Sequence, residues 1–344
     1  MEVFDILKEL VKFNTVEDKE NKEIIDFIEK YLKKYNFKLI KKDKYLIMES
    51  VGKKDEVGLG FLGHTDTVAP NENWKYDPYS LTKDGNKLFG LGVCDMKGGI
   101  SAFLSAISKV DLNMLNKKIR VYFTYDEEIG FSGIKEIVNI EKEFPKITII
   151  GEPTDNEILV GSKGIIELKV SFKGKKVHSG ISFKGKSAIF ECVSFINELR
   201  KFYDEEIKDV INNSYDVPFT TFNIGIINGG SEINSVAEDA YIMFDFRTIN
   251  DNEEEILKYA DMLVKKYNAK LEKLNVIPAF LNRSKFTDEM KTCSFITEAS
   301  FINGERLILG PGPVNPHEVD EYIEIESLNL TVEKYIKIIK EVCM

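Results

Sequence analysis

The chain has 344 residues, 43% of them hydrophobic, which is enough to bury one large core or two smaller ones. Its formal net charge of −10 argues against non-specific binding to nucleic acid or to anionic membranes, because both need a basic surface. The four cysteines are widely scattered, and no apolar run approaches the roughly 18 residues of a membrane span. The acidic, amphipathic N-terminus is unlike a secretion signal. We therefore expect a soluble, reduced, cytoplasmic protein.

The N-terminal part of the chain alternates helices with short buried strands. Apolar residues at helical spacing predict helices over about 3–11 and 24–32. Short apolar runs bounded by turns predict strands that are buried on both faces of an α/β sheet, at 57–63, 119–125 and 147–151. Each of these strands runs directly into a motif with a histidine or an acid, and active sites at the carboxyl ends of strands are typical of α/β folds.

The pattern changes after about residue 160. Ile166, Leu168, Val170 and Phe172 alternate with polar residues, which predicts a strand with one solvated face. A helix, two alternating segments, a second helix and another extended stretch follow, in the order typical of a ferredoxin-like α+β domain. We therefore expect this domain, residues 161–279, to be inserted in a first domain made of residues 1–160 and 280–344.

Two of the three histidines lie in contexts that suit metal binding. His64 stands in GFLGHTDTVAP, at the end of a predicted strand, and His317 stands in LGPGPVNPHEVDEYIE. If His64 binds a metal ion, Asp66 could orient the imidazole ring by accepting its other N–H. A histidine and an acid that merely cap a turn explain this fragment equally well.

Acidic residues at other strand ends complete the set. Asp95 precedes an apolar helix and, taken alone, is better explained as a helix cap. Glu127 and Glu128 point in different directions, so one can bind metal while the other activates a water molecule. The alternative is a surface cluster in a chain with 57 acidic residues, but the pair follows a deeply buried strand. Glu152 follows another apolar strand, where an unpaired carboxylate would be costly.

The motifs together resemble a known family. They are GHTDTV followed by WKYDPYSLT, then KLFGLGVCDMKGG, IIGEPT, VPFTTFNIGIINGG and TEASFINGERLILGPGPVNPHEVDEYIE. In this order they resemble the co-catalytic zinc deacylases and exopeptidases that include acetylornithine deacetylase, succinyl-diaminopimelate desuccinylase and aminoacylase. The resemblance covers nearly the whole chain and is greatest to the acetylornithine deacetylases. It implies a mixed-sheet zinc-exopeptidase-like catalytic domain with an inserted domain that serves as lid and as homodimer interface.

The resemblance also implies roles for the site residues. One metal ion would be bound by His64 and Glu152 and a second by Glu128 and His317, with Asp95 bridging both and preceding a cis peptide bond to Met96. Asp66 would orient His64, and Glu127 would act as general base and then general acid. The metals would be zinc, although cobalt and manganese also suit these ligands.

Three further residues lie in the inserted domain. His178, in FKGKKVHSGIS, reads from the sequence alone as a polar hairpin residue, whereas the resemblance implies that it reaches the partner subunit's site and stabilises the oxyanion. Asn234 and Arg247 match positions that bind the substrate near its carboxylate, a task that suits arginine. A salt bridge on the strand surface is the alternative for Arg247.

The function that the resemblance implies is removal of the acetyl group from N-acetyl-L-ornithine, a step of arginine biosynthesis. Another N-acyl amino acid (succinyl-diaminopimelate, acetyl-lysine or acetyl-citrulline) would need the same metal ligands. A metallo-aminopeptidase or dipeptidase would also share the centre. A non-enzymatic binding protein on a degenerate scaffold is disfavoured, because every ligand, the base and the lid histidine are present.

Overall fold

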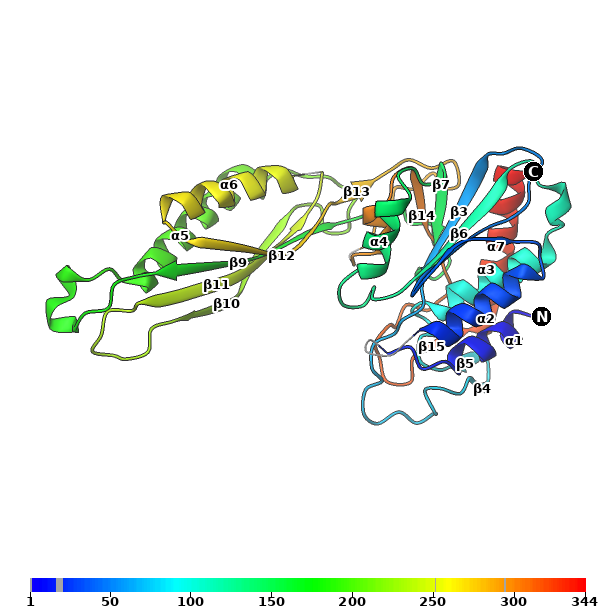
Figure 1. Cartoon of the computed structure of the whole chain (residues 1–344), viewed down its shortest axis with the longest axis horizontal. Coiled ribbons are helices and arrows are strands. Elements are labelled where there is room, and N and C mark those ends of the chain that lie inside the picture. Colours follow the sequence, from blue (N-terminus) through cyan, green and yellow to red (C-terminus); the bar gives the residue numbers. More distant parts are fainter. Residues whose placement is uncertain (1, 17–20, 251, 294) are drawn as a thin grey trace. The chain divides into compact units, whose positions relative to one another are not determined.

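The computed structural model describes residues 2–16, 21–250, 252–293 and 295–344 (Figure 1). The chain divides into two compact units. The first consists of Met1–Val160, Asn282–Met290 and Thr297–Met344, and the second of Gly161–Leu281 and Lys291–Ile296. In the sequence, the second unit is therefore inserted between segments of the first.

The first unit is built on a mixed six-stranded sheet with the order β1-β2-β6-β3-β7-β14. The strands are Lys38–Lys42 (β1), Leu46–Glu49 (β2), Val57–His64 (β3), Lys118–Thr124 (β6), Ile147–Ile150 (β7) and Glu305–Ile308 (β14). The pairs β1–β2 and β2–β6 are antiparallel, whereas β6, β3, β7 and β14 run parallel. The three predicted apolar strands are confirmed as β3, β6 and β7, and they lie next to one another.

Helices cover this sheet and include those predicted from apolar spacing. They are α1 (Val3–Val11), α2 (Lys22–Lys33), α3 (Lys97–Lys109), α4 (Ser132–Ile140) and α7 (Ile325–Cys343). Helix α3 packs against both α1 and α7. The ring of Phe61 on β3 stacks on that of Phe103 on α3 at 4.0 Å, and Tyr335 of α7 meets both rings edge-on at 6.0 Å. This aromatic cluster joins the last helix to the central strand.

A close approach of backbones sets the start of α3 against the end of β7. A Cβ atom on Gly99 would lie 1.9 Å from the carbonyl oxygen of Gly151. Only glycine fits at such a contact. Because Asp95 precedes α3 and Glu152 follows Gly151, this contact brings the two acids to the same edge of the sheet.

A small antiparallel sheet lies beside this edge. Its strands, in the order β15-β5-β4, are Tyr322–Glu324 (β15), Lys87–Phe89 (β5) and Thr82–Asp84 (β4). The pairing of β15 with β5 joins the C-terminal segment that follows His317 to the segment that precedes Asp95.

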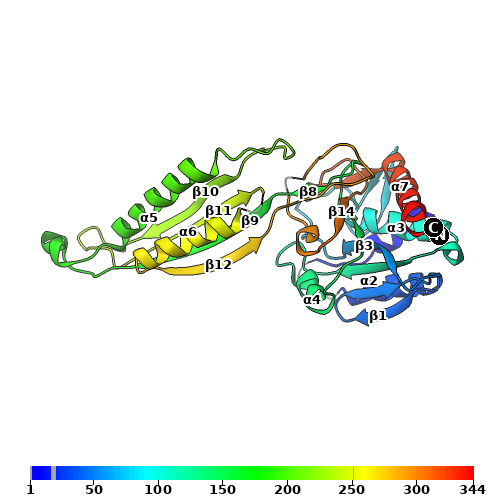
Figure 2. The same ribbon diagram turned by 90° about the horizontal axis from the view of Figure 1, so that it is seen from above.

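The second unit is a ferredoxin-like α+β fold with the antiparallel order β10-β11-β9-β12. Its elements are β9 (Gly164–Lys173), α5 (Ala188–Phe202), β10 (Thr221–Gly229), β11 (Asp239–Thr248), α6 (Glu253–Lys266) and β12 (Lys270–Ile277), with the short pair β8 (Gly161–Ser162) and β13 (Phe280–Leu281). Helices α5 and α6 lie on one face of the sheet, as Figure 2 shows, and bury the alternating residues of β9 that the sequence marks as apolar. In the described part of the chain, no helix is long and apolar enough to cross a bilayer.

Short helical turns complete the description. In the first unit they are Leu112–Met114 (η1) and Glu298–Phe301 (η4), and in the second Ser179–Lys184 (η2) and Tyr203–Ile207 (η3). The turn η4 packs near α4 and carries a buried glutamate that lies close to the candidate site.

Candidate metal centre

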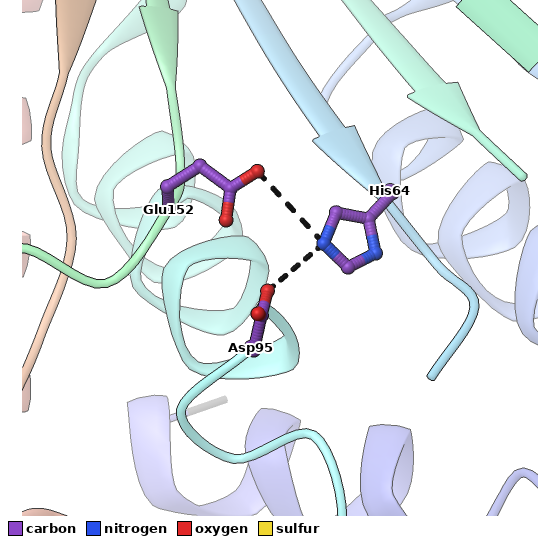
Figure 3. Close-up of side chains that lie close together, drawn as sticks. All are labelled: His64, Asp95 and Glu152. Carbon is purple, nitrogen blue, oxygen red and sulfur yellow. Dashed lines mark hydrogen bonds and ion pairs between the residues drawn. The ribbon is translucent and has the colours of Figure 1, made fainter. Parts of the chain in front are cut away.

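His64, Asp95 and Glu152 converge at the carboxyl edge of the main sheet (Figure 3). Nε2 of His64, the last residue of β3, lies 2.9 Å from Oδ1 of Asp95 and 3.9 Å from Oε1 of Glu152. One ligand atom from each residue falls within 4.8 Å of the others, which is close enough for a single ion. The His64 side chain is only 1% exposed and that of Glu152 only 4%. We call this group the first triad.

A second triad shares Asp95 with the first. It consists of Asp95, Glu128 and His317, whose ligand atoms also lie within 4.8 Å of one another. Nε2 of His317 is 3.1 Å from Oε2 of Glu128 and 3.8 Å from Oδ2 of Asp95. The two oxygens of Asp95 thus face different histidines, Oδ1 towards His64 and Oδ2 towards His317. That is the arrangement a bridging carboxylate requires.

The charges of the two triads suit divalent cations. Within the described residues, the ion pairs of Asp95, Glu128 and Glu152 are all with His64 or His317. Burial, reinforced by repulsion from Asp95, raises the pKa of Glu152 well above its usual range. Excess negative charge in a buried site is costly unless cations compensate for it. Imidazole and carboxylate ligands suit zinc, cobalt or manganese. The residues therefore fit two divalent ions.

Asp95 acts neither as a helix cap nor as an isolated surface acid. The residue at the start of α3 is Met96, which has no side-chain cap, and the Asp95 carboxylate contacts His64 instead. The peptide bond between Asp95 and Met96 is cis, as predicted.

Asp66 lies beside His64 but contacts it in two ways. Nδ1 of His64 is 3.1 Å from the main-chain oxygen of Asp66 and 3.6 Å from its carboxylate Oδ1. The other carboxylate oxygen, Oδ2, accepts the main-chain N–H of Glu128 at 3.2 Å. Asp66 thus connects a residue of the first triad to one of the second. Its role in orienting the imidazole ring remains a prediction.

Glu127 belongs to neither triad among the described residues, although it adjoins Glu128 and comes three residues after the end of β6. The residue is 9% exposed. Burial raises the pKa of its carboxyl group well above the usual range; His64 opposes this rise, and Asp95 and Glu128 add to it. A buried carboxyl group with a raised pKa beside a candidate metal site is suited to accept a proton and to return it.

His178 and Asn234 lie on adjacent exposed segments of the second unit. The main-chain N–H of Ser179 donates to the oxygen of Asn234 at 2.9 Å, and His178 forms a β-bridge with Ser235. Nδ1 of His178 accepts the N–H of Gly180 at 3.1 Å. In the neutral imidazole this contact places the ring proton on Nε2, which leaves that nitrogen as a hydrogen-bond donor.

Arg247 lies at the opposite end of the same sheet. It is near the end of β11, where Thr248 pairs with Gly164, whereas the segment with Asn234 precedes the start of β11, where Asp239 pairs with Lys173. Nine strand steps separate these ends, or about 30 Å at 3.3 Å per residue. The Nε of Arg247 donates to Asp245 at 3.0 Å, a surface ion pair with the arginine side chain 41% exposed. Binding of substrate by Arg247 remains a prediction.

Two buried acids near the triads escaped the sequence analysis. Glu298 is 1% exposed, and its Oε2 accepts the hydroxyl of Thr124 at the end of β6. Glu321 is 2% exposed and follows His317 by four residues. Glu298 begins a short turn, and Glu321 stands among other acids in HEVDEYIE, so neither has a periodic pattern that would mark it as buried.

Comparison with known proteins places the chain among metal-dependent hydrolases. Residues 60–341 match the model of the peptidase family M20/M25/M40. Acetylornithine deacetylase of Buchnera aphidicola subsp. Acyrthosiphon pisum (strain Tuc7) is 29% identical over 98% of this chain and 97% of its own length. The enzyme of the same name from Pasteurella multocida (strain Pm70) is also 29% identical, over 95% of this chain and 92% of its own.

Two solved structures share the fold. Aminopeptidase PepT from Bacillus cereus superposes with a TM-score of 0.78 and 21% identity, over 99% of this chain and 98% of its own. The YXEP protein of Bacillus subtilis, described as a dinuclear metal-binding peptidase of family M20, superposes with a TM-score of 0.72 and 14% identity, over 99% and 98%.

Proposed function

Because this chain belongs to the peptidase family M20/M25/M40, a family of metal-dependent hydrolases of amide bonds, we propose that it removes the acetyl group from N-acetyl-L-ornithine. The observation that carries the chemical part of this proposal is the pair of triads that share Asp95. The choice of substrate rests on relatives named acetylornithine deacetylase, which are similar over nearly the whole chain. The reaction would belong to arginine biosynthesis.

His64, Asp95 and Glu152 would hold one divalent ion, and Asp95, Glu128 and His317 the other. When bound, such ions supply Lewis acidity, which polarises a carbonyl oxygen and acidifies a water molecule. Zinc is the ion we propose first, and cobalt or manganese would suit the same ligands. Asp66, which contacts His64 and the backbone of Glu128, would hold a ligand of the first ion and a ligand of the second at a fixed distance from each other.

Glu127 would carry the proton through the reaction. Its carboxylate would accept a proton from the attacking water and pass it to the departing amine, so that the amide C–N bond breaks with a neutral leaving group. The burial that raises the pKa of Glu127 suits its second role, because it favours the protonated form that donates to the amine.

We propose that His178 acts on the site of a second subunit. Its Nε2–H would donate to the substrate carbonyl oxygen as negative charge develops there. His178 and Asn234 lie about 30 Å of strand away from Arg247, so the three residues of one chain cannot line one small-molecule pocket. If Arg247 binds the carboxylate of the substrate in the site of its own subunit, His178 and Asn234 must act in the site of another subunit.

The second unit also has features of a homodimer interface. Strand β10 is the edge of its sheet, and it exposes Ile226 and Ile227, which are 47% and 58% exposed. Phe190 on α5 is 74% exposed. Unpaired edge strands and exposed apolar patches are common sites of association. In a dimer formed through this unit, closure of the unit as a lid would bring His178 to the substrate.

A reducing location suits the chain. The four cysteines are scattered along the chain with no paired spacing, which favours a cytoplasmic protein, since secreted proteins of this size often carry disulfides. We accordingly place the reaction in the cytoplasm.

The proposed function is tested by measuring free-amine release by enzyme supplied with Zn²⁺ or Co²⁺. The panel comprises N-acetyl-L-ornithine, N-acetyl-lysine, N-succinyl-diaminopimelate and simple dipeptides, and kcat/KM is compared across it. We expect the highest kcat/KM with N-acetyl-L-ornithine. A higher kcat/KM with dipeptides would indicate a peptidase instead of a deacetylase. A higher kcat/KM with N-succinyl-diaminopimelate would indicate that the enzyme removes a succinyl group instead of an acetyl group.

A further inference from the structure

The buried carboxylate of Glu321 binds the turn that leads into Asp95. Its Oε1 accepts the main-chain N–H of Cys94 at 2.6 Å and that of Asp95 itself at 3.1 Å. Its Oε2 accepts the N–H of Gly92 at 3.0 Å. All three N–H groups donate to the same side chain, so Glu321 alone supplies much of the polar support of this turn.

The turn itself depends on such support. Gly92 has a φ of +75°, and a Cβ atom there would lie 2.7 Å from Cγ2 of Thr67, so the chain bends where only glycine fits. The buried N–H groups that follow the bend need acceptors, and Glu321 provides them. The direction in which the Asp95 carboxylate leaves the backbone is therefore set partly by Glu321.

Glu321 lies on the same segment as His317. Within that segment Asn315 donates to the main-chain oxygens of Pro313 and Tyr322, both at 3.0 Å, and accepts the N–H of Tyr322 at 3.0 Å. These bonds join the two ends of the loop that contains His317, and one of those ends, Tyr322, is the residue after Glu321. The same segment thus carries His317, a ligand of the second triad, and Glu321, which binds the turn that leads into Asp95.

We propose that Glu321 is a positioning residue that sets Asp95 relative to His317, so that binding of an ion by the second triad depends on it more than binding by the first. Two of the three ligands of the second triad, Asp95 and His317, depend on the Glu321 segment. In the first triad only Asp95 does, because His64 is the last residue of β3 and Glu152 comes two residues after β7. This inference rests on the proposed two-ion centre.

The test isolates each triad and then removes Glu321. Glu152→Ala leaves the second triad complete, and His317→Ala leaves the first. The affinity for Co²⁺ is measured by calorimetry for each of these full-length variants with and without Glu321→Ala. We expect the loss of Glu321 to weaken binding about 10- to 100-fold in the Glu152→Ala protein, as for other groups that orient metal ligands, and by less than about threefold in the His317→Ala protein.

Two further variants make the result interpretable. Glu318→Ala removes an exposed acid from the same loop and should leave Co²⁺ affinity unchanged. Glu321→Gln keeps one side-chain oxygen for the N–H groups of Cys94 and Asp95, so it should restore most of the affinity, and it replaces the alanine variant if that protein fails to fold.

The possible outcomes separate the inference from the proposed function. Equal losses in both backgrounds, or no loss in either, would overturn the positioning role of Glu321. If the unaltered protein binds fewer than two ions, the two-ion centre fails, whatever Glu321 does.

Discussion

Nε2 of His317 lies 3.1 Å from Oε2 of Glu128, although 189 residues separate them in the chain. Glu128 follows β6 and His317 follows β14, two strands that are separated in the sheet by β3 and β7. The second triad therefore forms only when β14 has paired with β7, and ion binding should be linked to folding.

Removal of metal should destabilise the protein. An ion that binds only the folded state stabilises it by about 2.7 kcal/mol when its free concentration is 100 times Kd. We expect the midpoint of thermal unfolding to rise with added Zn²⁺ and to fall with a chelator. In Asp95→Ala, which lacks the shared ligand, the midpoint should barely respond to Zn²⁺, and a full response in that variant would contradict the assignment.

Glu127→Gln should abolish turnover and leave ion binding intact. The amide cannot accept a proton, and general-base catalysis contributes about 10²- to 10⁴-fold, so kcat should fall by at least this factor. The matched change Glu128→Gln alters the neighbouring ligand and should lower ion content as well. Measurement of kcat together with ion content by atomic absorption distinguishes the two, and an active Glu127→Gln enzyme would remove Glu127 from the mechanism.

Glu298→Gln should stabilise the protein increasingly as pH rises. Burial raises the pKa of Glu298 from 4.5 to about 8 in the folded state, so the folded protein binds more protons than the unfolded chain between these values. Wild-type stability contributed by this group is therefore lost as pH rises from about 4.5 towards 8, whereas glutamine does not titrate.

The measurement for Glu298 is thermal unfolding of both proteins at pH 5, 7 and 8.5 in the presence of a chelator, since a nearby cation would itself lower the pKa. We expect nearly equal midpoints at pH 5 and a higher midpoint for Glu298→Gln at pH 8.5. A difference that does not change with pH would show that Glu298 is ionised throughout.

Ile227→Lys should convert the proposed dimer to monomers and thereby lower activity. The side chain lies on the exposed edge strand β10, and a charge there would oppose edge-to-edge association. Leu330→Lys places the same charge on α7 of the first unit, at a side chain 43% exposed, and serves as the control. Sedimentation velocity and kcat are compared for both, and a fully active monomer would contradict action of His178 on a partner's site.

The sequence predicted the residues of the triads better than their contacts. His64, Glu128 and Glu152 could be found because each follows an apolar strand that is buried on both faces, and such strands are easily recognised. Which of these residues contact one another could not be derived from periodicity. The contact between His317 and Glu128, for example, depends on the order of strands in the sheet.

The two buried acids near the triads were missed for a related reason. Glu298 and Glu321 are two among 57 acidic residues, and their burial follows from tertiary packing around short turns. The strands β4, β5 and β15 have three residues each, too few to show an alternating pattern. The pairing of β15 with β5, which brings Glu321 to the Asp95 turn, was therefore beyond prediction.

The most direct test of the two-ion centre is native mass spectrometry of the protein after Zn²⁺ loading, with Asp95→Ala and His317→Ala measured alongside. Two triads that share one carboxylate predict two ions per chain in the unaltered protein, one in His317→Ala and none tightly bound in Asp95→Ala. Two tightly bound ions in Asp95→Ala, or full activity of the unaltered protein with one, would contradict the account.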